Sequence, residues 1–202
     1  MANKPQSAVF TTVLWDGGSK IADFEQHLDR LKKHAQRLRI ILPDNLVETI
    51  TKLLPKNTGG MQLLNITYDV GKKEILLTPR ELPSTRNCDI HAMTLPANYW
   101  MGEVTGTKHG DWQPYLDAKN QANESGADIA LLIDEYSIID SDRASIIVID
   151  EDGVAYATNS NKSVDGITQK ILMSNLEKMG IPLNYGKLNE RLVSRCSEMI
   201  AV

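Results

Sequence analysis

The chain has 202 residues, 42% of them hydrophobic and 24% charged, which is the composition of a globular protein with a core of its own. Its 22 basic and 26 acidic side chains are interspersed and give a net charge of −4, which argues against a broad nucleic-acid surface but leaves room for one small anion pocket. The sequence has neither an N-terminal apolar leader nor an apolar run of membrane-spanning length. We therefore expect a soluble, cytoplasmic protein that binds neither nucleic acid nor membrane.

The first part of the chain is predicted to be α/β. The expected elements are, in chain order, a strand at 7–15, helices at 23–40 and 45–54, and a hairpin of strands at 61–70 and 74–82. Asp23 with Gln26 resembles a capping box at the start of the first helix, and Asn45 with Glu48 opens the second in the same way.

The stretch 83–103 is expected to be irregular because it contains Pro83, Pro96 and Gly102, and we place a boundary there between domains 1–95 and 96–202. The elements expected beyond it are a helix at 113–125, a strand at 127–134, a hairpin of strands at 144–149 and 154–158, and a helix at 167–179. Such a strand-dominated second half behind an α/β first half predicts an α+β fold.

Lys108 stands out in the segment "TGTKHGDWQPYLDAK", where it is predicted to lie at the exit of a strand, before a His-Gly turn. One interpretation is a solvated surface lysine; the other is a lysine whose amine does covalent chemistry. Lys119 is the rival amine, although it falls inside the predicted helix 113–125, where a solvent-facing side chain explains it better. The local sequence does not decide between these interpretations.

Four blocks of sequence together resemble one known family. "FEQHLDRLKKHAQRL" is similar to "F-x-x-H-L-x-R-L-x-x-S-A-x-x-L", and "GADIALLIDEYSIIDSDRASIIVIDEDGVAYAT" follows a run that begins "G-A-D-E-A-L-L-L-D". "TKHGDW" is similar to a segment that carries a Schiff-base lysine, and "GITQKIL" resembles a "G-I-T-R" phosphate loop. The blocks resemble those of the fold-type IV pyridoxal-phosphate enzymes, which are the branched-chain and D-amino-acid aminotransferases and the aminodeoxychorismate lyases. The resemblance covers roughly residues 8 to 200.

This resemblance implies a small N-terminal α/β domain, a C-terminal β-rich pseudo-barrel domain with helices, a homodimer, and pyridoxal 5'-phosphate as cofactor. Lys108 would be the catalytic lysine that forms the Schiff base. Arg30 and the segment Gly166, Ile167 and Thr168 would bind the phosphate, because a guanidinium and helix-start N–H groups both favour anions. A plain surface charge is the alternative for Arg30, and a simple helix start is the alternative for 166–168. We expect Arg30 and Thr168 to meet at one anion site.

The pyridine nitrogen of this cofactor needs a carboxylate to stay protonated. Ser145 stands where the family pattern has asparagine, and counting five residues back gives Asp140, where the family has glutamate. Aspartate is shorter by one C–C bond, about 1.5 Å of reach. Asp142 is two residues further on and remains an alternative.

No metal site is expected. His27 and His34 are one heptad apart on the predicted helix, and we interpret both as packing or solvated residues, because no carboxylate or thiol pattern accompanies them. The two cysteines, Cys88 and Cys196, are far apart and lack metal-type spacing.

Two classes of function stay open. The first is a pyridoxal-phosphate aminotransferase acting on an amino-acid or keto-acid small molecule, with the lyase activity as an alternative inside the family. The second is a non-catalytic relative kept as a binding or interaction protein. Lys108, Arg30 and Thr168 favour the first class. Asp140, Ser145 and ends that are short relative to the family pattern, with nine residues before Phe10 and a stop at Val202, favour the second.

Overall fold

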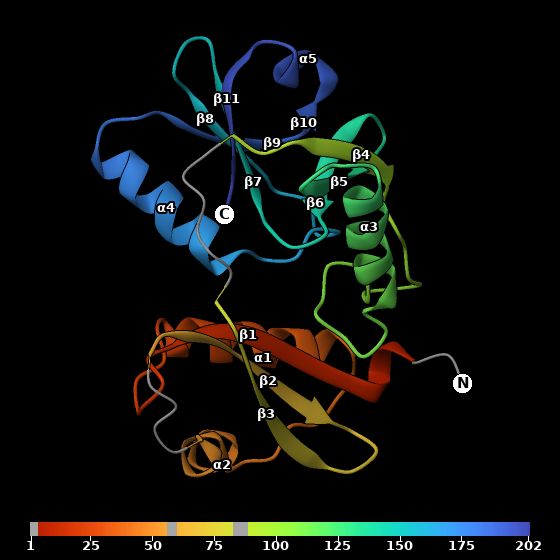
Figure 1. Cartoon of the computed structure of the whole chain (residues 1–202), viewed down its shortest axis with the longest axis vertical. Helices are drawn as coiled ribbons and strands as arrows, with labels where there is room; N and C mark the ends of the chain where they lie inside the picture. The colour runs from red at the N-terminus through yellow and green to blue at the C-terminus, as the bar shows by residue number, and fades with distance from the viewer. Residues whose placement is uncertain (1–3, 56–59, 83–88) are drawn as a thin grey trace. The chain divides into compact units, whose positions relative to one another are not determined.

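The computed structural model describes residues 4–55, 60–82 and 89–202. Its contacts divide the chain into two compact units, and each is described by itself (Figure 1). The N-terminal unit comprises Met1–Asn87 with Thr107–Trp112, and the C-terminal unit comprises Cys88–Gly106 with Gln113–Val202. The domain boundary that we placed at residue 95 stays a prediction.

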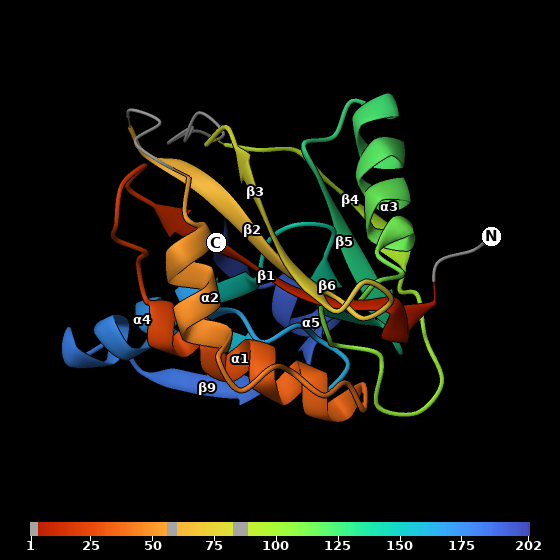
Figure 2. The same cartoon turned by 90° about the horizontal axis from the view of Figure 1, so that it is seen from below.

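The N-terminal unit is a three-stranded antiparallel sheet with two helices. A 3₁₀ turn, Pro5–Ser7, leads into the strands, which lie in the order β1 (Ala8–Trp15), β2 (Gln62–Asp69), β3 (Glu74–Arg80). Helix α1 (Phe24–Arg37) packs against β1, and α2 (Leu46–Leu53) packs against β3 (Figures 1 and 2). Alternate residues of β1 are buried, so this strand has one core face, formed by Val9, Thr11, Val13 and Trp15.

The strands and helices predicted for this unit are confirmed, but the predicted caps are wrong. Asp23 has the left-handed backbone angles φ 49° and ψ 34°, and its side chain makes no capping hydrogen bond. A capping side chain needs an extended backbone at that residue, so the two geometries exclude each other. Asn45 also makes no capping hydrogen bond from its side chain.

Residues 107–112 return to the N-terminal unit and run beside β1. His109 forms an isolated antiparallel bridge with Val9, and the Phe10 N–H donates to the Lys108 carbonyl at 3.2 Å. Lys108 is therefore not at the exit of a strand, as we predicted; it follows the turns at 101–107 and opposes Phe10 across a short bridge. The pairing partner lies about one hundred residues away in the chain, so local sequence could not indicate it.

The C-terminal unit contains two four-stranded sheets. The first has the order β10 (Leu188–Asn189), β6 (Ser137–Ser141), β5 (Ile129–Asp134), β4 (Ala92–Pro96), with β4 and β5 parallel. The second has the order β11 (Cys196–Ala201), β7 (Ile146–Asp150), β8 (Ala155–Thr158), β9 (Leu183–Gly186), with β8 and β9 parallel. Helix α3 (Gln113–Glu124) packs against β4 and β5, α4 (Ile167–Lys178) contacts β9, and α5 (Glu190–Val193) contacts β7 and β10 (Figure 1).

The helices, the strand 127–134 and the hairpin predicted for this unit are confirmed, and the α+β fold is confirmed with them. The expectation that 83–103 is irregular is wrong at β4, which pairs with the buried strand β5. Pro83 and Cys88 lie outside the described residues. Within the described residues, no helix is both long enough and apolar enough to cross a membrane.

Candidate functional site

Arg30 is a buried cation in the N-terminal unit. It projects from α1, is 8% exposed, and donates from Nη2 to Thr11 Oγ1 on the core face of β1 at 2.8 Å. The surface-charge interpretation of Arg30 is therefore wrong. A guanidinium fixed in this way keeps several N–H donors at defined angles, which suits recognition of an anion.

His27 completes a polar cluster around Arg30. Its Nδ1 lies 2.9 Å from Thr11 Oγ1 and 3.4 Å from Arg30 Nη2. Burial lowers the pKa of His27 to about 4, and the positive charges of Arg30 and Lys108 act in the same direction. The imidazole is thus neutral at physiological pH, and its Nδ1 can accept the Thr11 hydroxyl proton while Thr11 accepts from Arg30.

Lys108 is half-buried, and its ammonium group lies between two aromatic rings. Nζ is 5.2 Å from the centroid of the Phe10 ring and 4.7 Å from that of the Trp112 ring. The two rings contact each other edge to face at 5.0 Å. Aromatic faces attract cations and exclude water, so this lysine differs from a solvated surface lysine. Lys119, in α3, has no comparable aromatic contact among the described residues.

The peptide of Lys108 is held from both sides. Its carbonyl accepts from Phe10 of β1, and its N–H donates to His34 Nδ1 of α1 at 3.1 Å. The neighbouring His109 is fully buried, and burial lowers its pKa to about 4. The backbone that carries the Lys108 side chain is thus attached to both layers of the N-terminal unit.

Asp140 is a buried carboxylate of β6 in the C-terminal unit. Its Oδ1 accepts the Ser141 N–H at 2.9 Å, and its Oδ2 accepts the Val164 N–H at 3.0 Å and the Tyr115 hydroxyl at 3.3 Å. Burial, followed by the charge of Asp140, raises the pKa of Tyr115, so the phenol remains a donor. Trp100 stacks on Tyr115 with the ring centroids 6.0 Å apart.

Asp142 has a different environment. Its Oδ1 accepts the Ala130 N–H at 2.8 Å, and its Oδ2 accepts from Arg143 Nε at 2.6 Å. These bonds tie the end of β6 to the start of β5. Each oxygen of Asp142 therefore already holds a partner that stabilises the sheet.

The segment 166–168 forms the start of α4. A Cβ on Gly166 would lie 2.1 Å from Ser145 Oγ, so only glycine allows this close approach of the helix start to the residue before β7. Ile167 is buried and Thr168 is exposed. The N–H groups of a first helical turn have no partner inside the helix, and Val164, which donates to Asp140, lies just before this turn. The structure thus places Asp140 near the start of α4.

Three residues of these clusters escaped the sequence reasoning: Thr11, His34 and Tyr115. The signal for His34 was available, because the quoted motif has serine at that position. Tyr115 was a candidate only as a buried aromatic residue on an otherwise polar helix. Thr11 interrupts the apolar face of a predicted core strand, which was a signal for a buried polar contact.

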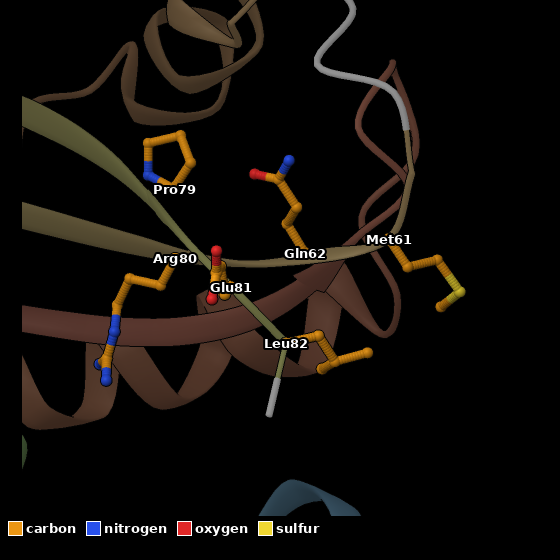
Figure 3. Close-up of a pocket in the computed structure, with 6 residues that line it drawn as sticks. All are labelled: Met61, Gln62, Pro79, Arg80, Glu81 and Leu82. Carbon is orange, nitrogen blue, oxygen red and sulfur yellow. The ribbon is translucent and has the colours of Figure 1, made fainter. Parts of the chain in front are cut away.

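A shallow pocket at the start of β2 and the end of β3 carries no comparable chemistry. Its lining side chains diverge and do not converge on one point (Figure 3). The register places it at the far end of the sheet from Lys108, because Gln62 pairs with Trp15 whereas Lys108 pairs beside Phe10. Ligand sites have convergent polar groups, and this pocket lacks them.

Comparison with known proteins gives a consistent result. Residues 8–202 match the family described as amino-transferase class IV. A protein described as a probable branched-chain-amino-acid aminotransferase of Rickettsia bellii (strain RML369-C) is 23% identical over 189 residues, which cover 84% of this chain and 65% of that protein. The chain therefore spans slightly less than two thirds of the length of this curated relative.

Solved structures share the fold. A fold IV transaminase from Curtobacterium pusillum has a TM-score of 0.83 at 19% identity and covers 98% of this chain, with 75% of its own length matched. A candidate 4-amino-4-deoxychorismate lyase has a TM-score of 0.82 at 23% identity, with 98% and 80% covered. A branched-chain amino acid aminotransferase from the source abbreviated T.th., solved with pyridoxamine 5'-phosphate, has a TM-score of 0.80 at 18% identity, with 98% and 73% covered. Together with the family match over residues 8–202, these findings make the chain a member of the class IV aminotransferase family.

Proposed function

We propose that the chain is a pyridoxal-phosphate-dependent aminotransferase that acts on an amino acid or keto acid, with Lys108 as the residue that binds the cofactor covalently. The observation that carries the proposal is the position of the Lys108 amine, held between Phe10 and Trp112 on a peptide fixed at both its N–H and its carbonyl. A lysine placed in this way by chance on a family member is less simply explained.

The described residues fit the cofactor group by group. Its aldehyde requires an amine, which Lys108 offers. Its phosphate requires cationic and N–H donors, which the buried Arg30 and the start of α4 at Gly166, Ile167 and Thr168 offer. Its ring nitrogen requires a carboxylate, which Asp140 offers. That Arg30 and Thr168 meet at one anion site stays a prediction.

Each of these residues has a role that its chemistry allows. When bound, the cofactor supplies an aldehyde for attachment and a ring that withdraws electrons from the α-carbon of the substrate. Lys108, once released by the substrate amine, moves the proton of that α-carbon. Asp140 holds the proton on the ring nitrogen, an interaction worth about 4 kcal/mol at 4 Å and an effective dielectric constant of 20. Arg30 and the α4 N–H groups keep the cofactor in register.

Asp140 is a better candidate than Asp142 for the carboxylate role. The donors that hold Asp140 on Ser141, Val164 and Tyr115 are neutral groups, so they orient the carboxylate without cancelling its charge. Asp142 instead forms a salt bridge with Arg143, which already compensates its charge. The shorter side chain of aspartate is compatible with this role only if the three donors around it hold the carboxylate in place.

A lyase activity of the aminodeoxychorismate type is the second candidate. It is favoured by the likeness to the candidate 4-amino-4-deoxychorismate lyase, of which the matched part covers a larger share than it does of the transaminases named above. Both activities use the same cofactor and the same lysine. Incubating the loaded protein with amino acids and, separately, with aminodeoxychorismate separates them by product.

The decisive experiment is a labelling experiment. The protein is incubated with pyridoxal phosphate, absorbance near about 410 nm is recorded, and the adduct is reduced with borohydride and mapped by peptide mass spectrometry. We expect the pyridoxyl group on Lys108, and neither the absorbance band nor that label in Lys108→Ala. Labelling mainly at Lys119 would contradict the assignment. Binding without any half-reaction would favour a non-catalytic binding protein.

A homodimer and a cytoplasmic location complete the proposal and rest on the family resemblance alone. Light scattering coupled to gel filtration measures the assembly directly. A monomer that still binds the cofactor with full affinity would contradict the dimer.

A further inference from the structure

The N–H of Lys108 has an unusual acceptor for a segment beside a strand. The Lys108 carbonyl faces β1 and accepts from Phe10, so its N–H points to the other edge of the segment. There it meets Nδ1 of His34, a residue 74 positions away on α1 and only 3% exposed. An N–H at such an edge otherwise requires water or another strand.

This contact fixes the ring state of His34. Only an unprotonated Nδ1 can accept a hydrogen bond, so His34 must be neutral with its proton on Nε2. The motif quoted above has serine at this position. A serine hydroxyl is attached directly to Cβ and is too short to replace Nδ1, so this contact is a feature of the present chain.

We propose that His34 is a positioning residue for Lys108. By accepting the Lys108 N–H, it locks the peptide against β1 and thereby holds the ε-amine between Phe10 and Trp112, where the aldehyde of the cofactor is bound. The inference rests on the proposed function of Lys108 for its consequence in cofactor binding. Its structural part, the control of the amine by His34, stands without any cofactor.

The geometry of the side chain provides a sharp test. In asparagine, Oδ1 is bonded to Cγ, as Nδ1 is in histidine, so His34→Asn keeps an acceptor near the same place. In glutamine the polar atoms are bonded to Cδ and lie about 1.5 Å further out. His34→Gln therefore removes the acceptor while keeping a polar side chain of similar size. His91→Asn, at an exposed histidine of the C-terminal unit, controls for the loss of a histidine.

Two measurements on the protein without cofactor read out the positioning. Amide exchange at Lys108, followed by NMR, should be about fivefold faster in His34→Gln than in the wild type, and near wild type in His34→Asn and His91→Asn. Competitive acylation with acetic anhydride should be at least about threefold faster at Lys108 in His34→Gln, because the amine leaves the aromatic rings. The rate at Lys119 should be unchanged and serves as the internal reference.

A third measurement links the amine to cofactor attachment. The rate of pyridoxal-phosphate attachment to Lys108 should fall by at least about threefold in His34→Gln and recover in His34→Asn, since a displaced amine meets the aldehyde less often in the right geometry. Faster acylation with slower attachment is a pair of opposite changes that a merely loosened fold would not produce.

The outcomes separate the two proposals. Equal amide exchange in all four proteins, or faster exchange without any change at the amine, would overturn the positioning role. If no protein, including the wild type, attaches the cofactor at Lys108, the proposed function fails. Amide exchange and acylation then decide the role of His34 by themselves.

Discussion

Asp140→Asn is the substitution that tests the C-terminal part of the candidate site most directly. The carboxylate is 7% exposed and accepts N–H groups on both oxygens, from Ser141 on Oδ1 and from Val164 on Oδ2. An asparagine has one oxygen, so its amide group must face one of these two backbone donors. That backbone N–H then loses its acceptor in a buried place.

The magnitude follows from these contacts. Losing one charge-assisted hydrogen bond and leaving one buried donor unsatisfied costs about 2 to 4 kcal/mol of unfolding free energy. Urea unfolding of the cofactor-free protein measures it. Asp142→Asn is the matched comparison: it keeps an oxygen for Ala130 and weakens only the pair with Arg143, whose side chain is 41% exposed, so it should cost about 1 kcal/mol or less.

Activity should separate the same two variants in a second way. Asp140→Asn should still attach pyridoxal phosphate at Lys108, yet lose about a hundredfold or more in the half-reaction with an amino acid, because a neutral amide cannot hold the proton of the ring nitrogen. Asp142→Asn should keep the activity, and Asp140→Glu should keep or raise it if the site has room. Equal activity of the wild type and Asp140→Asn would show that Asp142, or no acid, has this role. An unchanged unfolding free energy would contradict the hydrogen bonds themselves.

Two further predictions concern stability. His27 and His109 have pKa values lowered from 6.5 to about 4, so the unfolded chain binds their protons as the pH falls below 6.5 while the folded chain does not; unfolding free energy should be fully present above pH 6.5 and decrease by about 2 kcal/mol in all toward pH 4, and His27→Gln should reduce that slope in urea titrations. Gly106→Ala should lower the melting temperature more than Gly126→Ala, since both residues have positive φ angles but only at Gly106 would a Cβ meet a backbone atom, the Asn161 carbonyl oxygen at 2.4 Å. Equal melting temperatures would show that the loop yields without cost.

Apolar periodicity predicted the long elements because burial determines them. In β1 and α1 the residues spaced at two or at three to four positions are the ones that the structure buries. The caps failed because they depend on the backbone angles of a single residue, and Asp23 adopts the left-handed region. Strand β4 was missed because its proline lies at the last residue, Pro96, where it does not interrupt the pairing with β5.

The short strands near the C-terminus could not be predicted for a different reason. Strand β10 has two residues and β9 has four of mixed polarity, so neither contains enough positions to show an alternation. They form because β6 and β8 present edges for pairing. Sequence likewise could not choose between Asp140 and Asp142, since both are aspartates on the same predicted strand face; their hydrogen-bond partners distinguish them.

The cluster around Arg30 shows why a polar threonine and a histidine lie in the core of the N-terminal unit. Thr11 accepts from Arg30 and can donate to His27, so each member satisfies the next. Because His27 stays neutral at physiological pH, it orients the guanidinium without adding a third positive charge to those of Arg30 and Lys108. A phosphate carries between one and a half and two negative charges near neutral pH, as a rough guide from phosphorylated side chains. Two cations match that charge, whereas a protonated His27 would raise the cost of assembling the cluster before an anion binds.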